Sequence, residues 1–203
     1  MSISGIFDTK KMKRIILASG SPRRKQLLEL AEIPFEVEVS EIDESYPEGL
    51  RPAEIAIHIA SNKARAVQQK IDTEKNSPLT ILAVDTVVVL ENEIIGKPLN
   101  RQNAIEILSK LSGRIHKVIT GVCILTGFEE KIFSEETEVA FHELSLVQIE
   151  HYIDNYKPYD KAGAYAIQEW IGAVGIKSIR GDFYNVMGLP VSRVAQELAT
   201  QQN

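Results

Sequence analysis

The chain has 203 residues, of which 44% are hydrophobic and 25% are charged, a composition typical of an ordinary globular protein. A formal net charge of −5 argues against a dedicated nucleic-acid binder, which usually carries a basic face. The single cysteine, Cys123, excludes an internal disulfide, and no apolar run reaches the roughly 18 residues that a membrane span needs. We therefore expect a cytoplasmic protein with one domain over residues 14–203, either undivided or in two lobes, preceded by an N-terminal extension over residues 1–13.

A strand-like run followed by a helix start lies near the N-terminus, in Ile15-Ile16-Leu17-Ala18-Ser19-Gly20-Ser21-Pro22-Arg23-Arg24. A strand-like apolar run ends in Ser-Gly-Ser, and an amphipathic helix follows, with Ser21 as N-cap through its hydroxyl and Pro22 at the first helical position. The free N–H groups of a helix start, the guanidiniums of Arg23 and Arg24 and the hydroxyls of Ser19 and Ser21 would suit phosphate oxygens. Neither the P-loop spacing nor Gly-x-Gly-x-x-Gly is present, so an ordinary capped helix with two solvated arginines remains the alternative.

The first half of the chain alternates between helical and strand patterns. The expected elements are a helix that ends before Pro34, a half-buried strand over 35–39, a helix that begins at Pro52, a strand over 80–90 buried on both faces, and a hairpin turn at 91–93.

The second half adds long strands and two well-marked helix starts. The expected elements are a helix from the N-cap Asn100 to Leu111, antiparallel strands over 115–125 and 130–141, a helix after the capping box Ser145-x-x-Gln148, strand-like segments at 165–168 and 172–179, a loop over 182–190 and a helix over 191–199. Together these predict an α/β fold with a mixed, twisted sheet and helices on both sides.

Asp85 interrupts the buried strand and is the sharpest single signal for chemistry. A buried carboxylate is unfavourable unless it is paired or binds a metal, so the alternatives are a functional aspartate at a strand end and a structural one paired with a nearby lysine. Lys97, in Gly96-Lys97-Pro98, follows a predicted hairpin that could return it toward Asp85, or it is an exposed turn lysine. The acidic residues Glu41, Asp43 and Glu44 either form a solvated turn or supply a second carboxylate for a divalent cation.

The remaining polar candidates combine with these into one set of cations, hydroxyls and carboxylates. This is what a metal-dependent phosphoanhydride hydrolase needs, because cations bind polyphosphate, carboxylates hold metal and a base activates water. The set consists of Ser19, Ser21, Arg23, Arg24, Glu44, Lys63, Asp85, Lys97, Lys161 and Gln168.

The chain also resembles the Maf proteins, because it contains a set of short motifs in the same order as that family. The resemblance rests on Ser19-Gly20-Ser21-Pro22-Arg23-Arg24, Asn62-Lys63-Ala64, Ala83-Val84-Asp85-Thr86, Gly96-Lys97-Pro98, Ser112-Gly113-Arg114 with Thr120-Gly121-Val122, Asp160-Lys161-Ala162-Gly163-Ala164-Tyr165 with Gln168, and Asn185-Val186-Met187-Gly188-Leu189-Pro190.

This resemblance implies a mixed α/β fold around a long central cleft, related to the inosine triphosphate pyrophosphatases, in a protein that forms homodimers. It implies a nucleoside triphosphate pyrophosphatase that uses Mg²⁺, Mn²⁺ or Co²⁺ and acts on small-molecule nucleotides rather than on nucleic acid or membranes. Asp85 would accept the proton of the attacking water, Glu44 and Asp85 would hold the metal, and Lys63 and Lys97 would contact the phosphates.

The family that the chain resembles divides into branches by substrate, and the residues at three positions indicate to which branch this chain is similar. Arg23, Thr86 and Gln168 match the branch that prefers dTTP and UTP, and a glutamine can both donate to and accept from a pyrimidine edge. The alternatives are a pyrophosphatase that prefers another base such as 7-methyl-GTP, and a non-hydrolytic nucleotide-binding regulator of septum formation. Modified pyrimidine triphosphates are further candidate substrates, in a housecleaning role.

Overall fold

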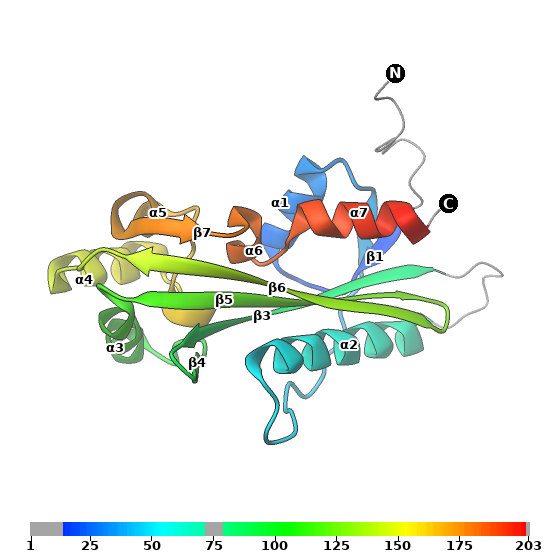
Figure 1. The fold of residues 1–203 in the computed structure, drawn as a ribbon, viewed down its shortest axis with the longest axis horizontal. Coiled ribbons are helices and arrows are strands. Elements are labelled where there is room, and N and C mark those ends of the chain that lie inside the picture. Colours follow the sequence, from blue (N-terminus) through cyan, green and yellow to red (C-terminus); the bar gives the residue numbers. More distant parts are fainter. Residues whose placement is uncertain (1–13, 72–78, 202–203) are drawn as a thin grey trace. The chain divides into compact units, whose positions relative to one another are not determined.

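In the computed structural model, which describes residues 14–71 and 79–201, the strands form one seven-stranded sheet in the order β2-β1-β3-β5-β6-β7, with β4 paired to β3 (Figure 1). Strand β1 pairs in parallel with β2 and β3, whereas the β3–β4 and β6–β7 pairs are antiparallel, so the sheet is mixed as predicted. The expected N-terminal extension lies outside the described residues. The strands are β1 (Ile15–Leu17), β2 (Phe35–Val37), β3 (Thr80–Leu90), β4 (Glu93–Ile95), β5 (Ile115–Thr126), β6 (Glu129–Phe141) and β7 (Ile176–Arg180).

The helices begin largely where the sequence signals place them. Pro22 and Pro52 each stand at a first helical position, Asn100 accepts from the Asn103 N–H at 2.9 Å, and Ser145 forms the expected capping box with Gln148. The helices are α1 (Pro22–Leu30), α2 (Pro52–Lys70), α3 (Arg101–Leu111), α4 (Leu146–Tyr156), the 3₁₀ turn η2 (Ala162–Ala164), α5 (Trp170–Gly175), α6 (Phe183–Val186) and α7 (Val191–Gln201).

The chain divides into two compact units, and β3, β5 and β6 each contribute residues to both. The first unit comprises residues up to Asp85, Gly121–Ser134 and the chain from Gly188 onward. Within it, α2 lies on one face of the strands and α1 and α7 lie on the other (Figure 1). Small side chains bring α2 close to the sheet: Ala60 and Ala64 pack in a buried cluster with Ala18, Ala83 and Cys123.

The second unit comprises Thr86–Thr120 and Glu135–Met187 and has its own core. Helices α3 and α4 contact each other, α3 also contacts η2, and both helices share one buried cluster with residues of β3, β5 and β6. Its buried cluster includes Val88, Leu108, Val118, Tyr152 and Tyr165.

Several local predictions were wrong in whole or in part. Ser21 is the N-cap residue of α1, but its side chain makes no capping bond. The strand expected at 165–168 is a turn region. The strand expected at 172–179 is confirmed only from Ile176 onward, as β7, and is preceded by α5, because the chain folds back on itself: an added Cβ at Gly172 would lie 1.7 Å from the Ile167 carbonyl oxygen. The expected loop over 182–190 contains α6, whose first turn is capped by Asp182 accepting from the Tyr184 N–H at 2.7 Å.

Candidate functional site

The turn between β1 and α1 is organised around the buried Ser19 hydroxyl. Ser19 Oγ accepts hydrogen bonds from Arg24 Nη1 at 2.9 Å and from the Ser21 N–H at 3.3 Å. Arg24 Nε donates to the Gly188 carbonyl at 2.8 Å, so this guanidinium also joins the turn to the segment before α7. We call Ser19, Ser21, Arg23 and Arg24 the Ser19 turn.

Several charges of the first unit act on Arg24. Burial lowers the pKa of Arg24 to about 10, Asp85 and Glu44 act to raise it, and Arg23 acts to lower it. Arg24 therefore remains a cation at neutral pH. The charges of Asp85 and Glu44 thus reach Arg24, which places the Ser19 turn in the electrostatic field of these carboxylates.

Lys63 brings Glu44 and Asp85 together. Its Nζ lies 2.7 Å from Glu44 Oε1 and 2.6 Å from Asp85 Oδ1. Lys63 extends from α2, Asp85 interrupts the buried run of β3, and Glu44 belongs to the segment after β2. We call Glu44, Lys63 and Asp85 the carboxylate–lysine cluster. Asp85 thus has features of both alternatives. It is paired with a lysine, as a structural aspartate would be, and it lies near a second carboxylate, as a functional one would.

The carboxylate–lysine cluster has the donor chemistry that a hard divalent cation requires. Two carboxylates converge on one point that already holds a positive charge. Within residues 14–71 and 79–201 there is no group of three or more histidine, cysteine, aspartate or glutamate side chains suited to a metal. Mg²⁺ is commonly held by one or two carboxylates together with substrate phosphates, so a pair of carboxylates fits it.

In the second unit, Thr86 belongs to a hydrogen-bonded series of buried polar groups. The Thr86 and Thr120 hydroxyls lie 3.0 Å apart, and Thr120 Oγ1 donates to the Asn185 carbonyl at 3.3 Å. Asn185 Nδ2 donates to the Val118 carbonyl at 3.1 Å and to Thr137 Oγ1 at 3.0 Å. Because the single Thr120 proton is directed to Asn185, the Thr86 hydroxyl donates to Thr120.

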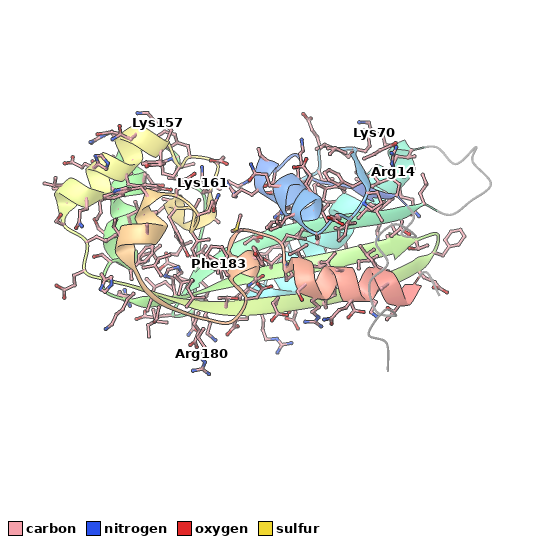
Figure 2. The ribbon with its side chains drawn as sticks, turned by 90° about the horizontal axis from the view of Figure 1, so that it is seen from above. Arg14, Lys70, Lys157, Lys161, Arg180 and Phe183 are labelled. Atoms are coloured by element: carbon pink, nitrogen blue, oxygen red, sulfur yellow. The ribbon has the colours of Figure 1, made fainter. Side chains whose placement is uncertain are left out.

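Lys161 and Gln168 flank a tightly held segment of the second unit. Lys161, labelled in Figure 2, is buried, with Nζ 2.7 Å from Asp160 and 3.6 Å from Glu169. Tyr152 donates from its hydroxyl to Glu169 and accepts from the Ala166 N–H at 3.1 Å. Gln168 itself is exposed.

Lys97 is exposed, and its loop is fixed by the backbone rather than by its side chain. The Gly163 N–H donates to the Gly96 carbonyl at 3.1 Å, which joins the Lys97 loop to η2. Gly163 has φ of +71°, a conformation that favours glycine. Lys97 and Lys161 are therefore carried by connected segments of the same unit.

Sequence reasoning missed Thr120 and Asn185. Both are fully buried polar residues, and both lie in segments that carry the family resemblance, but nothing local in the sequence indicates that Asn185 lies beside Thr120. His116 is buried, and its Nε2 lies 2.7 Å from the Tyr165 hydroxyl. Burial lowers the pKa of His116 to about 4, so this ring is neutral at neutral pH. Burial likewise raises the pKa of the Cys123 thiol to about 12, as expected of a core cysteine.

Comparison with known proteins identifies the family. The family model described as Maf-like protein matches residues 14–201. A dTTP/UTP pyrophosphatase of Cytophaga hutchinsonii is 50% identical over 189 residues, which cover 93% of this chain and 84% of that protein. Proteins of the same name from Parabacteroides distasonis and Bacillus cereus are 46% and 47% identical, over 95% and 92% of this chain and 98% and 95% of their own lengths. The chain belongs to the Maf family, as the ordered motifs predict.

A solved structure, the Ham1 protein of Staphylococcus aureus, is 18% identical, with a TM-score of 0.40 over 64% of this chain and 72% of that one. Of the helices in the described part of the chain, none has the length and apolar character needed to cross a membrane.

Proposed function

We propose that this protein is a nucleoside triphosphate pyrophosphatase that hydrolyses dTTP and UTP to the monophosphate and pyrophosphate with the help of a divalent cation. The names of relatives that are 46% to 50% identical over nearly the whole chain support this activity. The structural observation that carries the proposal is the carboxylate–lysine cluster, in which Glu44 and Asp85 lie within 2.7 Å and 2.6 Å of one ammonium. The same unit contains the cationic Ser19 turn.

Asp85 is the proposed proton acceptor. The water oxygen forms a bond to phosphorus, the α–β anhydride bond breaks, pyrophosphate leaves with the electron pair of that bond, and the water proton passes to the Asp85 carboxylate. The side chain of Asp85 is 14% exposed, which shields it from bulk water and suits a positioned base. A general base of this kind contributes about 10²–10⁴-fold to the rate.

Glu44 and Asp85 would hold the divalent cation, which we propose to be Mg²⁺, Mn²⁺ or Co²⁺. When bound, such a cation supplies Lewis-acid stabilisation of the negative charge on the phosphates. Lys63, Lys97 and Lys161 offset the charge that develops on the leaving pyrophosphate, because an ammonium is a mobile point charge on a flexible stem.

The remaining proposed site residues bind the triphosphate and the base. Ser19, Ser21, Arg23 and Arg24 provide hydroxyls and guanidiniums for phosphate oxygens. Thr86 and Gln168 recognise the base, where an amide side chain can both donate to and accept from a pyrimidine edge.

We also propose where the protein is located and how it assembles. We propose a cytoplasmic enzyme, because a lone buried cysteine is typical of a reducing compartment. The family resemblance suggests a homodimer, and light scattering on the purified protein measures the mass directly.

The test is product analysis with dTTP, UTP, CTP and 7-methyl-GTP in the presence of Mg²⁺, for the wild type and Asp85→Asn. We expect dTTP and UTP to yield monophosphate and pyrophosphate, and the variant to lose about 10²–10⁴-fold in kcat. Asp154→Asn, which changes an exposed aspartate paired with Arg101, is the matched control and should keep full activity.

Three results would count against the proposal. If Asp85→Asn keeps most of its turnover, Asp85 is not the proton acceptor. If 7-methyl-GTP is the best substrate, the chemistry stands but the assignment of substrate preference to Arg23, Thr86 and Gln168 is wrong. If nucleotides bind without being hydrolysed, the regulator hypothesis replaces the enzyme.

A further inference from the structure

The Lys63 ammonium contacts the same two carboxylates that are proposed to hold the divalent cation. The side chains of Lys63 and Asp85 are only 17% and 14% exposed, so water screens their attraction in part. The carboxylate–lysine cluster contains two negative charges and one positive charge, and both carboxylates also interact electrostatically with the Arg24 cation of the Ser19 turn.

A metal ion and the ammonium cannot occupy this place together. Mg²⁺ binds carboxylate oxygens at about 2.0–2.1 Å, inside the space that an ammonium occupies when its nitrogen contacts the same oxygens. Lys63 Nζ lies 2.7 Å from Glu44 Oε1 and 2.6 Å from Asp85 Oδ1, so it already takes the shared position. Repulsion between the two cations at such short range adds to the steric conflict.

We propose that Lys63 is an exchangeable cation that keeps Glu44 and Asp85 together until a divalent metal displaces it, after which its ammonium is released toward the triphosphate. This inference rests on the proposed use of a metal by Glu44 and Asp85. Its physical basis is that the four-carbon stem of a lysine can swing to a new partner while α2 stays in place.

The exchange links metal binding to nucleotide binding. When the metal binds the two carboxylates, Lys63 loses both ion-pair partners. Its ammonium can then bind phosphate oxygens. Metal and triphosphate should then strengthen each other's binding by the same factor, as thermodynamic linkage requires. A nucleotide bound without metal would have to compete with Glu44 and Asp85 for the same ammonium.

The first experiment measures Mn²⁺ affinity by electron paramagnetic resonance, without nucleotide and without turnover. Lys63→Met and Lys63→Gln remove the competing charge, and we expect both to bind Mn²⁺ at least about tenfold more tightly than the wild type. Lys63→Gln keeps a hydrogen-bond donor beside the carboxylates, which protects the test against a folding defect in Lys63→Met. Asp85→Asn should lose the site, which assigns the bound Mn²⁺ to this cluster.

The chain offers a matched control in Arg101. This guanidinium also joins two carboxylates, with Nε 2.8 Å from Asp154 Oδ1 and Nη2 3.2 Å from Glu150 Oε1, but on an exposed helix surface. Arg101→Met should leave Mn²⁺ affinity unchanged. An equal gain in Arg101→Met would show that any freed pair of carboxylates produces the effect, and would overturn the proposal.

The second experiment observes the displacement itself. Acylation of lysine amines, followed by mass spectrometry, reports how accessible each ammonium is. We expect Mg²⁺ or Mn²⁺ alone to raise the labelling rate of Lys63 several-fold, and metal plus a non-hydrolysable dTTP analogue to lower it again. Lys131, which pairs with Glu197, should label at a constant rate and serves as the internal reference.

The outcomes separate this inference from the proposed function. Unchanged labelling of Lys63 on metal addition, or unchanged Mn²⁺ affinity in both Lys63 variants, overturns the exchange even if dTTP is hydrolysed. Tighter Mn²⁺ binding in both variants together with metal-induced labelling supports the exchange, even if the wild type releases no pyrophosphate from any triphosphate.

Discussion

Arg24 donates from Nη1 to the Ser19 hydroxyl at 2.9 Å, and this contact fixes what the hydroxyl can do. Ser19 Oγ also accepts from the Ser21 N–H at 3.3 Å, so both of its lone pairs are engaged by donors. The single Ser19 proton is then directed away from both donors. A hydroxyl held in this way is a donor for an anionic oxygen, which agrees with the proposed binding of phosphate by the Ser19 turn.

The first prediction is that Arg24 contributes to nucleotide binding in part through Ser19. Arg24→Lys keeps the charge but cannot reach both Ser19 and the Gly188 carbonyl, because an ammonium lacks the planar fork of a guanidinium. We expect KM for dTTP to rise about tenfold in Arg24→Lys and in Ser19→Ala, with a smaller change in kcat. Steady-state kinetics of the two single variants and the double variant measure this.

The double variant decides how the two residues act. If Arg24 acts through Ser19, the double variant should be little worse than either single one, whereas additive losses would show independent roles. Arg14→Gln is the control, since Arg14 is an exposed arginine paired with Glu36 and should leave KM unchanged.

The sequence predicted those features whose physical cause lies within a few residues. Pro22, Pro52, Asn100 and the Ser145 capping box each specify a helix start locally, and the apolar run that Asp85 interrupts specifies a buried strand. These signals depend on hydrogen bonds and φ angles of neighbouring residues, so they can be recognised in the sequence without knowledge of the fold.

Features that depend on distant segments were not predictable in the same way. No local pattern places Lys63 between Glu44 and Asp85, and none places Asn185 beside Thr120. The strand expected at 172–179 is present only from Ile176 onward, because the preceding residues turn back so that Gly172 lies against the Ile167 carbonyl. The family resemblance marked these segments but gave no contacts.

The second prediction concerns Thr120, which is fully buried and links Thr86 to Asn185. Thr120→Val keeps the shape but removes the hydroxyl, and we expect it to destabilise the protein by about 1–2 kcal/mol because buried polar groups lose a partner. If Thr86 contacts the base, KM for UTP should also rise several-fold with kcat nearly unchanged, and Thr120→Ser should restore both. Urea unfolding and steady-state kinetics measure the two effects.

A second pair of threonines on the same strands provides the control for Thr120. Thr80 and Thr126 also lie with their hydroxyls 3.0 Å apart, but both are partly exposed. Thr126→Val should cost less stability, since water can replace the lost hydroxyl, and should leave KM for UTP unchanged. An equal change of KM in Thr126→Val would show that the effect is not specific to Thr86.

The third prediction is a pH dependence of stability that comes from His116. Burial lowers the pKa of His116 from its usual 6.5 to about 4. Between these values the unfolded chain binds the proton and the folded chain does not, so the free energy of unfolding falls as the pH is lowered from about 6.5 to about 4. The slope that His116 adds is at most about 1.4 kcal/mol per pH unit.

Variants at His116 and His142 isolate this contribution from that of the carboxylates. His116→Phe should be less stable at pH 7, because the bond to the Tyr165 hydroxyl is lost, but its stability should fall less steeply between pH 6.5 and 4. His142→Gln changes an exposed histidine and should keep the wild-type slope. Parallel curves for His116→Phe and the wild type, from urea unfolding at a series of pH values, would contradict the prediction.

The last prediction concerns Gly121, where β5 meets the start of α2. A Cβ at this position would lie 2.3 Å from the Ala56 carbonyl carbon and from the Ile57 nitrogen, so the backbone of α2 must move to accept any side chain. We expect Gly121→Ala to lower the free energy of unfolding by about 1–3 kcal/mol or more through overpacking. Because α2 also carries Lys63, a shift of this helix should weaken the contacts of Lys63 with Glu44 and Asp85 and lower activity.

Gly96→Ala, where an added Cβ meets no atom within 4 Å, is the control for stability. Thermal and urea unfolding of the two variants measure the difference, and an equal loss in both would show that backbone freedom of glycine, rather than the close approach of α2, determines the cost.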